Sequence, residues 1–290
     1  MMQLNPIIKR DLEMRSRRLA LPAALVILNS LLFLIGLLGT FGVVSEMQGS
    51  CRASYGAMLQ NYALVTAAAF LLILLISPLL TAGSISGERE SGTFDLLMTT
   101  RLTPGHIIVE KTLSAALSAG AIAISTWPAL LLPLLFGGVG IGEAAVLLLL
   151  MLPGAFLMLC IGMFSSAASY GSVRSTALTY GIGLALLAGT ILVPLLMRPF
   201  MTAGGNVFAY LLAANPLLPC FSVLSGQLGS EGALEGVMTA LGLRADPSFL
   251  KHAALIGLLL QVAFSMGLLL PSVLLITPGR RLGRQKHNIG

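Results

Sequence analysis

Long apolar runs, in which Leu, Ala, Ile and Val follow one another without alternating with polar residues, separate the charged positions of this chain. A helix needs roughly 20 apolar residues to cross the hydrocarbon of a bilayer, and several of the runs reach that length. Backbone polar groups must be paired within the membrane, so a spanning segment is a helix or part of a closed barrel. The absence of period-2 alternation excludes the barrel. We therefore predict an all-α integral membrane protein with six transmembrane helices, at about 19–44, 62–83, 112–136, 144–167, 176–197 and 252–277.

A seventh charge-free interval, between Arg198 and Glu231, is not predicted to span the membrane. Proline, glycine and asparagine interrupt it so often that no continuous 20-residue helix fits. The interrupting residues are Pro199, Gly204, Gly205, Asn206, Asn215, Pro216, Pro219 and Gly226. We expect the external segment 198–251 to form short helices at the outer surface.

The distribution of basic residues predicts the orientation. Six spans with the N terminus in the cytoplasm place thirteen Lys and Arg residues inside and four outside, which agrees with the positive-inside rule. We therefore expect a multi-pass protein of the inner (plasma) membrane with both termini cytoplasmic, including the basic tail 279–290. No cleavable signal peptide is evident, because the first apolar run is too long.

Composition supports a membrane location. Only 10% of the 290 residues are charged and mean hydropathy is +0.93, whereas soluble domains carry roughly 25% charged residues. The net charge of +6 comes from basic residues next to the spans, where they suit anionic lipid head groups. We therefore expect membrane lipids, and no nucleic acid, among the partners.

Residues 1–18 are predicted to form an amphipathic helix in the cytoplasmic membrane interface. Asn5 is a suitable N-cap and Pro6 a suitable first helical residue. At 100° per residue the apolar and basic side chains fall on opposite arcs. Ile7, Ile8 and Leu12 lie on the apolar arc, with Lys9 and Arg10 opposite. The alternative is that this segment only extends the first span into water.

The loop 84–111, between the second and third predicted spans, carries helix start and stop signals. A charged helix is expected to run through Glu90 and stop near Gly92. A short helix capped by Thr93 should follow over 93–100, and Thr103-Pro104 should begin the helix that enters the third span. The apolar residues of the short helix are Phe94, Leu97 and Met98. They indicate a surface for a partner protein, unless the loop merely packs on the membrane face.

Catalytic and metal-binding patterns are missing from the sequence. There is no G-x-x-x-x-G-K-[ST] loop for ATP, and the three histidines have no partners at metal-ligand spacing. We expect no metal site, no catalytic residues and no cofactor in this chain. Cys160 is expected to be a small buried residue, whereas Cys51 and Cys220 fall on predicted outer segments and could form a disulfide.

Ionisable residues are absent from the middle of every predicted span, although ion-coupled carriers and proton pumps generally rely on them. The polar side chains within spans are small, and we expect them to hydrogen-bond between helices. They are Asn29, Ser30, Ser77, Ser125, Thr126, Ser165, Ser166 and Gln261.

Two segments resemble a known family. Residues 87–97 (Gly-Glu-Arg-Glu-Ser-Gly-Thr-Phe-Asp-Leu-Leu), followed by Thr99-Thr100-Arg101-Leu102-Thr103-Pro104, resemble the first cytoplasmic loop of type-2 ABC transporter permeases. That family has a G-E-R-E-x-G-T-x-x-x-L-L pattern there. The opening Asn5-Pro6-Ile7-Ile8-Lys9-Arg10-Asp11-Leu12 is similar to the family's N-terminal segment. The loop pattern is quite specific, whereas the six-span plan is generic.

The resemblance implies a permease subunit of an ABC exporter, which dimerises with a second permease subunit, identical or different, and docks a cytoplasmic ABC ATPase. ATP and Mg²⁺ would then belong to that ATPase, and this chain would not itself be an enzyme. The N-terminal segment would be the connecting helix, and the helix over 93–100 the coupling helix. The implied contact residues are Glu88, Arg89, Glu90, Gly92, Thr93, Phe94, Leu97 and Met98 in the loop, with Ile7, Ile8, Lys9, Arg10 and Leu12 in the connecting helix.

Other classes of function remain as alternatives. The first is an ATP-independent membrane carrier or channel, against which the lack of an ionisable residue within the spans counts. A membrane-embedded enzyme would need a catalytic constellation that the sequence does not contain. A scaffold or sensor subunit without transport activity is the third alternative. The sequence does not identify a transported substrate.

Overall fold

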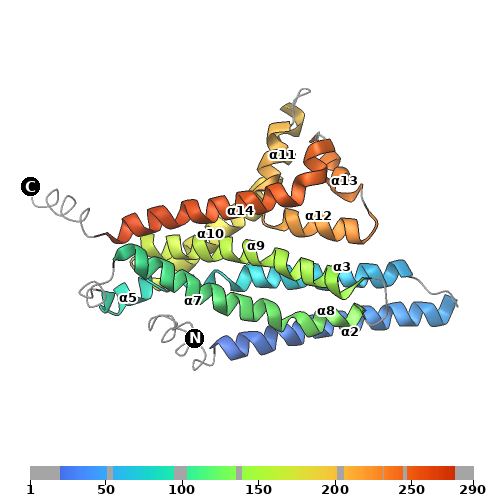
Figure 1. Cartoon of the computed structure of the whole chain (residues 1–290), viewed down its shortest axis with the longest axis horizontal. Coiled ribbons are helices and arrows are strands. Elements are labelled where there is room, and N and C mark those ends of the chain that lie inside the picture. The colour runs from blue at the N-terminus through green and yellow to red at the C-terminus, as the bar shows by residue number, and fades with distance from the viewer. Residues whose placement is uncertain are drawn as a thin grey trace, which may run out of the picture.

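The computed structural model describes residues 20–50, 55–94, 103–134, 139–200, 206–230, 232–243 and 247–277, and the regular elements within these ranges are all helices (Figure 1). The predicted connecting helix 1–18 and tail 279–290 lie outside these ranges. The spans are formed by α2 (Ala20–Ser50), α3 (Tyr55–Ile76) with α4 (Leu79–Ala82) and α5 (Ser86–Glu90), α7 (Pro104–Ser125) with α8 (Trp127–Leu134), α9 (Ile141–Ala168), α10 (Ser172–Met197) and α14 (Pro247–Ile276).

Six helical segments of the described chain are long and apolar enough to cross a membrane, which confirms the predicted number. Several extend beyond the predicted apolar intervals, because polar residues at their ends continue the helix into water or cap it. Thr103 is the predicted N-cap of α7, and its side-chain oxygen accepts a hydrogen bond from the His106 N–H at 3.4 Å. At the start of α9, the Gly140 N–H donates to the Glu143 carboxylate at 3.0 Å.

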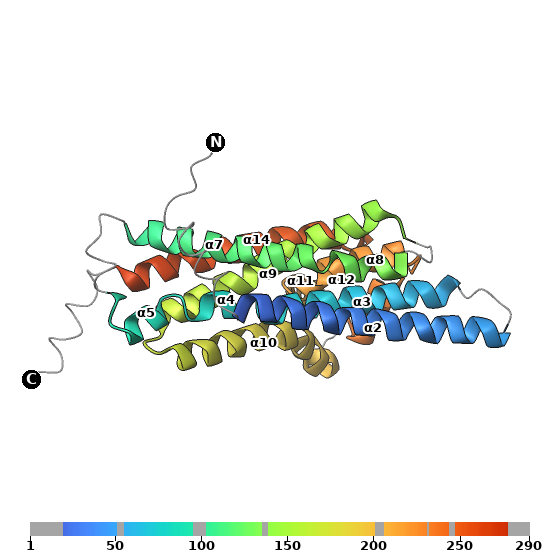
Figure 2. The same cartoon turned by 90° about the horizontal axis from the view of Figure 1, so that it is seen from below.

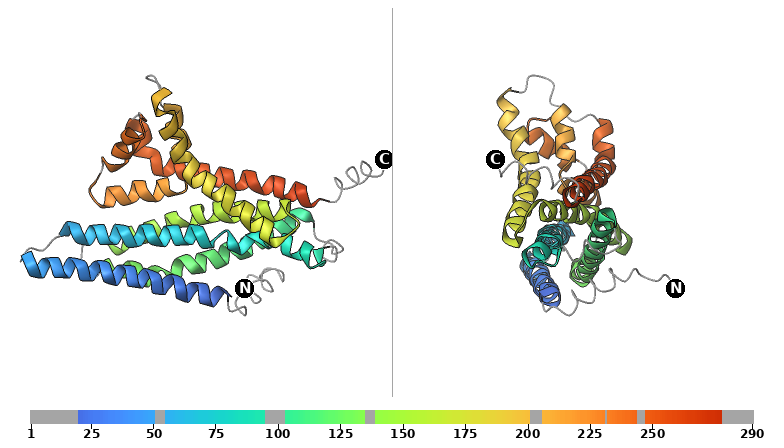
Figure 3. Two further views of the ribbon diagram at one scale, coloured as in Figure 1. Left: turned by 180° about the vertical axis from the view of Figure 1, so that it is seen from behind. Right: turned by 90° about the vertical axis from the view of Figure 1, so that its left-hand side faces the viewer.

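The central helix of the bundle is α9. It packs most extensively against α14 and also against α10, α7 and α4, as the end-on view shows (Figure 3, right). Its buried residues Leu147, Met151, Ala155 and Leu157 belong to the largest apolar core of the described chain. Most of the other spans therefore take their positions by packing around α9, whereas α2 packs mainly on α3 and α8.

The outer surface of the bundle is strongly apolar. Leu38 on α2, Leu64 on α3, Leu259 on α14 and Leu270 on α14 are each more than half exposed, as are many other large apolar side chains. A soluble monomer rarely exposes contiguous apolar surface of this extent, whereas lipid tails cover it without cost. Together with the six apolar helices, this surface indicates a multi-pass membrane protein.

The first and last spans both have a terminus at the same end of the bundle. In Figures 1 and 2, α5, the start of α7 and the end of α14 lie together, and the start of α2 lies toward the same end but farther inward. We call this the α5 end, and the opposite one, where α8 and α12 lie, the α12 end. Of the Lys and Arg residues in the described ranges, Arg89, Lys111 and Arg174 lie toward the α5 end, whereas Arg198, after α10, and Lys251, at the start of α14, lie away from it.

The segment between α10 and α14 forms short helices at the α12 end: the 3₁₀ turn Arg198–Phe200, α11 (Asn206–Ala213), α12 (Leu217–Gln227) and α13 (Ala233–Ala240). Short helices are what the sequence predicts for this segment, and one of them, α12, is partly buried in the bundle. Its Cys220 and Leu224 are buried in the main core, because α12 packs beside α9 and α14. The Cys220 thiol is free and only 4% exposed, so the conceivable disulfide with Cys51, a residue outside the described ranges, is not formed.

Most of the polar residues singled out within spans pair with other groups of the protein, as membrane packing requires. The Asn29 amide donates to the Ser125 hydroxyl at 3.0 Å and so joins α2 to α7. Ser77 and Thr126 donate to carbonyls of their own helices, at Ile73 and Ala123. These contacts fit a structural role for these side chains.

Gln261 gives a test of this role. Its side chain is 1% exposed on α14 and donates to the Pro216 carbonyl, at the start of α12, at 3.3 Å. Replacing Gln261 with leucine should lower the free energy of unfolding by about 1 kcal/mol, because interhelical hydrogen bonds in membranes contribute about that much. Thermal unfolding in detergent measures the loss. Replacing Val262, an exposed neighbour on the same helix, with leucine is the control and should change nothing.

Candidate functional site

The predicted coupling loop begins with α5, which ends at the expected position. The N–H of Thr93 donates to the Glu88 carbonyl at 3.0 Å, and the N–H of Gly92 donates to the Arg89 carbonyl at 3.2 Å. This pair of bonds is a Schellman motif, which needs a residue with positive φ. Gly92 has φ of 71° and supplies it without steric cost. The helix-stop prediction for this glycine is thus confirmed.

Glu88 binds the start of the third span. Its carboxylate accepts a hydrogen bond from the Lys111 ammonium on α7 at 2.7 Å, and the same ammonium donates to the Ser84 carbonyl at 3.0 Å. Lys111 is buried, so its charge needs both partners. The pair therefore joins α5 and α7 through a contact that water screens only partly.

Arg89 binds the end of α9. One guanidinium nitrogen donates to the carbonyls of Ala167, at 2.7 Å, and Ser169, at 3.0 Å. The guanidinium also lies over two aromatic rings, 5.0 Å from the centroid of Phe94 and 5.4 Å from that of Tyr170. A cation at the carboxyl end of a helix is favoured by the helix dipole. Arg89 thus fixes the coupling loop to the junction between α9 and α10.

Glu90 binds the start of α10. Its carboxylate accepts hydrogen bonds from the Ser172 N–H at 2.9 Å and from the Ser172 hydroxyl at 2.6 Å. An acidic group is favoured at a helix N-terminus, where backbone N–H groups are unpaired. Glu88, Arg89 and Glu90 therefore reach three different spans from one turn of helix. We refer to these three residues as the clamp.

Serine hydroxyls complete the attachment of the loop. Ser166 of α9 accepts hydrogen bonds from the N–H groups of Ile85, at 2.9 Å, and Ser86, at 3.0 Å. These are donors at the start of α5 that have no partner within the helix. Ser175 of α10 donates to the Ala82 carbonyl at the end of α4. These serines thus attach the loop to α9 and α10, two of the three helices that the clamp contacts.

Phe94 is buried, which corrects the expectation that it presents an apolar surface to a partner. Its side chain is 5% exposed and lies in a small core with residues of α7, α9 and α14 and the residue before α5, beneath the guanidinium of Arg89. The other buried members are Ile85, Ile108, Met163, Ala167 and Ile276. Phe94 therefore anchors the beginning of the predicted coupling helix from inside the bundle.

The remaining predicted contacts lie outside the described ranges: Leu97 and Met98 of the loop, and Ile7, Ile8, Lys9, Arg10 and Leu12 of the connecting helix. Two exposed residues near the clamp were missed from the sequence. Tyr170 is 69% exposed and Val173 is 83% exposed. Their loop is short and carries no motif, so only the folded chain brings it next to α5.

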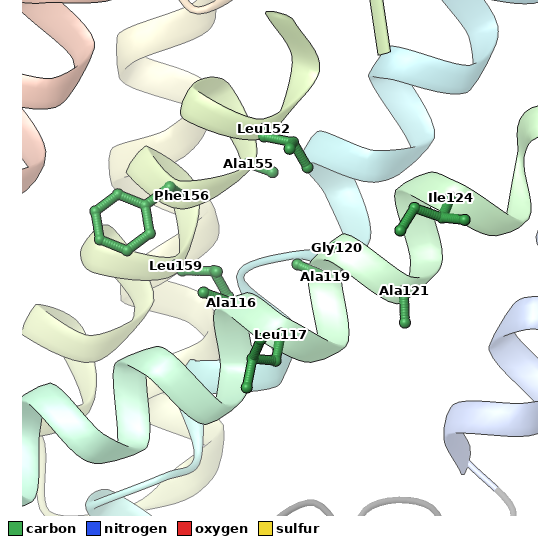
Figure 4. Close-up of a pocket in the computed structure, with 10 residues that line it drawn as sticks. All are labelled: Ala116, Leu117, Ala119, Gly120, Ala121, Ile124, Leu152, Ala155, Phe156 and Leu159. Atoms are coloured by element: carbon green, nitrogen blue, oxygen red, sulfur yellow. The ribbon is translucent and has the colours of Figure 1, made fainter. Parts of the chain in front are cut away.

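An apolar groove of about 420 Å³ lies between α7 and α9 (Figure 4). Its floor includes Ala119 and Ala155, and Leu117, Ile124 and Phe156 form its sides. The lining side chains have no polar atoms, so the groove offers no chemistry for a charged substrate. Within the described residues, no group of three or more His, Cys, Asp or Glu side chains gathers to hold a metal ion.

The chain matches no protein-family model and no curated protein. The site is therefore interpreted from its own contacts and from the resemblance of its loop.

Proposed function

We propose that this chain is the membrane-spanning permease subunit of an ATP-binding-cassette exporter. It would form the translocation path with a second permease subunit and couple to a separate cytoplasmic ATPase. The observation that carries the proposal is the clamp: the segment that resembles the family's first cytoplasmic loop binds α7, α9 and α10 through three consecutive side chains. A force applied to this loop reaches three spans directly.

The α5 end suits a cytoplasmic partner. It carries the described loop between the second and third spans, and two exposed side chains with apolar surface, Tyr170 and Val173, project next to the clamp. We place this end in the cytoplasm because the predicted orientation puts most basic residues there. ATP binding at the partner would shift the permease between conformations only as far as the two conformations differ in their affinity for it.

The first test is co-purification. The tagged chain, solubilised gently from its native host, should carry a stoichiometric soluble ATPase that mass spectrometry identifies. Replacing Leu97 with aspartate should remove the ATPase and leave the permease in the membrane, because a charge in the coupling helix would oppose an apolar contact. Phe94 is unsuitable for this test, because its burial means that a charge there would disturb folding.

The matched control is replacement of Val237 with aspartate. Val237 is an exposed apolar residue of α13 at the α12 end, so this variant should retain the ATPase. Retention of the ATPase by the Leu97 variant would show that the contact is assigned to the wrong residue. A dimeric, intact preparation of the native chain without any ATPase would favour the ATP-independent carrier or channel.

A further inference from the structure

The second span is broken at Ser77-Pro78, between α3 and α4. Pro78 has no N–H to donate to the carbonyl four residues before it, and the Ser77 hydroxyl donates to the Ile73 carbonyl at 2.6 Å, a pairing that bends helices. Beyond the break, the N–H groups of Leu80 and Thr81 donate to carbonyls three residues back, at 3.1 and 3.2 Å, as in a 3₁₀ turn. The two parts of this span are thus joined by weakened backbone structure.

The segment beyond the break, α4 with α5, is attached to helices that come later in the chain. The Thr81 hydroxyl donates to the Leu159 carbonyl of α9 at 2.8 Å, and Gly162 leaves room for α4 to approach the α9 backbone. The Ser175 bond and the clamp continue the attachment to α10 and α7. We call α4, α5, α7, α9, α10 and α14 the base, together with α12, which packs on α14 and α9.

The segment before the break, α3, packs against α2. The Asn61 amide of α3 donates to the Thr40 hydroxyl at 3.1 Å and to the Gly36 carbonyl at 3.4 Å. Gly39 makes room for this contact, because a Cβ there would lie 1.9 Å from the Asn61 side-chain oxygen and force that side chain to move. The two helices run side by side in Figure 2. They therefore form one hairpin held by a polar contact of its own.

A second break separates α7 from α8 at Ser125–Pro128, where Pro128 again removes a helix donor. Beyond it, α8 packs mainly on α2 and α3 and much less on α7 and α9. Trp127 and Leu130 of α8 share a small core with Val65 of α3 and Ile35 of α2, and Leu148 is its one member from α9. This part of the third span thus accompanies the hairpin, although α7 belongs to the base.

We propose that α2, α3 and α8 move as one body against the base, pivoting at Ser77-Pro78 and Ser125–Pro128. The contact between the two bodies is largely apolar, with Phe70 of α3 seated against Gly154 of α9, and packed apolar faces permit small sliding motions. The Asn29–Ser125 hydrogen bond between α2 and α7 lies at the second pivot. Across the first pivot, the Tyr180 hydroxyl of α10 donates to the Leu75 carbonyl at 2.7 Å. This bond stabilises the observed arrangement. The proposal does not depend on the ATPase.

The motion should be largest at the α12 end, far from the first pivot. There, Tyr62 of α3 lies in the same core as Cys220 and Leu224 of α12. Spin labels at Leu64 on α3 and Phe221 on α12, both exposed, report the distance between the bodies by pulsed electron paramagnetic resonance. Control pairs within one body are Leu38 with Leu64 in the hairpin, and Val109 with Leu255 in the base. Alanine replaces the native cysteines in the full-length chain in lipid nanodiscs.

The Leu64–Phe221 distances should be more broadly distributed than those of both control pairs, or form two populations. Replacing Pro78 with alanine restores a helix donor and should narrow the distribution to the width of the controls. Pro153, inside the unbroken α9, is the matched control, and its replacement with alanine should leave the width unchanged. Replacing Tyr180 with phenylalanine frees the first pivot and should broaden the distribution.

Two results would overturn the proposal. One is a native Leu64–Phe221 distribution as narrow as the controls. The other is a width that neither the Pro78 nor the Tyr180 substitution changes. The Tyr180 variant loses only the hydrogen bond that its hydroxyl donates at the surface of the bundle. It therefore provides a test even where the Pro78 variant fails to fold.

Discussion

Replacement of Arg89 with alanine is expected to lower the free energy of unfolding by about 3 kcal/mol, since a hydrogen bond to a charged group contributes about 1.5–3 kcal/mol and a cation–π contact about 0.5–1 kcal/mol. The variant loses the bonds to the carbonyls of Ala167 and Ser169 and the stacking on Phe94 and Tyr170. Ser169 is buried, so its carbonyl would lack a ready replacement partner.

The chain contains its own probe for this measurement. Cys160 and Cys220 are buried, so a thiol-reactive fluorogenic dye labels them only as the protein unfolds, once alanine replaces Cys51. Lysine at position 89 should recover part of the loss, because it keeps the charge but not the planar fork of donors.

Arg174 is the matched control. It is exposed near the start of α10, and its replacement with alanine should change stability by less than about 0.5 kcal/mol, as surface substitutions usually do. Equal stability losses in the Arg89 and Arg174 variants would mean that a basic charge at the α5 end, and not the contacts of Arg89, stabilises the bundle.

Local signals explain what could be predicted from the sequence. The six spans follow from the length of the apolar runs alone. The start of α7 at Pro104 and the end of α5 before Gly92 follow from cap residues that act on their nearest neighbours. Each of these predictions needs no knowledge of the rest of the chain, and each is confirmed.

Long-range packing explains what could not be predicted. Arg89 and Glu90 find their partners at residues 78 to 82 positions away, in a loop without any motif. Periodicity alone does not show that Phe94 faces inward, because an apolar residue on a short helix suits a partner surface as well as a core. The insertion of α12 beside α9 likewise depends on Gly257 of α14, which leaves room for Pro219.

Long-range packing also decides which glycines of the spans can be replaced. Most glycines in the described helices have open space where a Cβ would stand, but Gly162 of α9 does not. A Cβ there would lie 2.3 Å from the Thr81 hydroxyl oxygen, 2.9 Å from the Pro78 carbonyl oxygen and 3.3 Å from the Ala82 nitrogen. Two of these atoms are backbone, so no side-chain rotation relieves the contact. The sequence gives no sign of this difference, because it depends on where α4 crosses α9.

Replacing Gly162 with alanine should therefore destabilise the protein by about 2 kcal/mol, within the range of about 1–3 kcal/mol seen for overpacked cores. Alanine would otherwise favour the helix by about 1 kcal/mol relative to glycine. Gly267 is the control, because it lies inside α14 with nothing within 4 Å of its Cβ position. Its replacement with alanine should stabilise the protein. The thiol-labelling assay measures both variants.

A second substitution identifies which contact is responsible. Replacing Thr81 with alanine removes the oxygen nearest to the new methyl group, so the double variant should recover part of the stability that the Gly162 variant loses. The recovery should be incomplete, because the Pro78 carbonyl remains 2.9 Å away. Strictly additive effects of the two substitutions would mean that they do not interact, and that α4 does not press on α9 at this crossing. Non-additive effects would instead show that the added methyl group presses on α4 where it crosses α9, next to the first pivot at Ser77-Pro78.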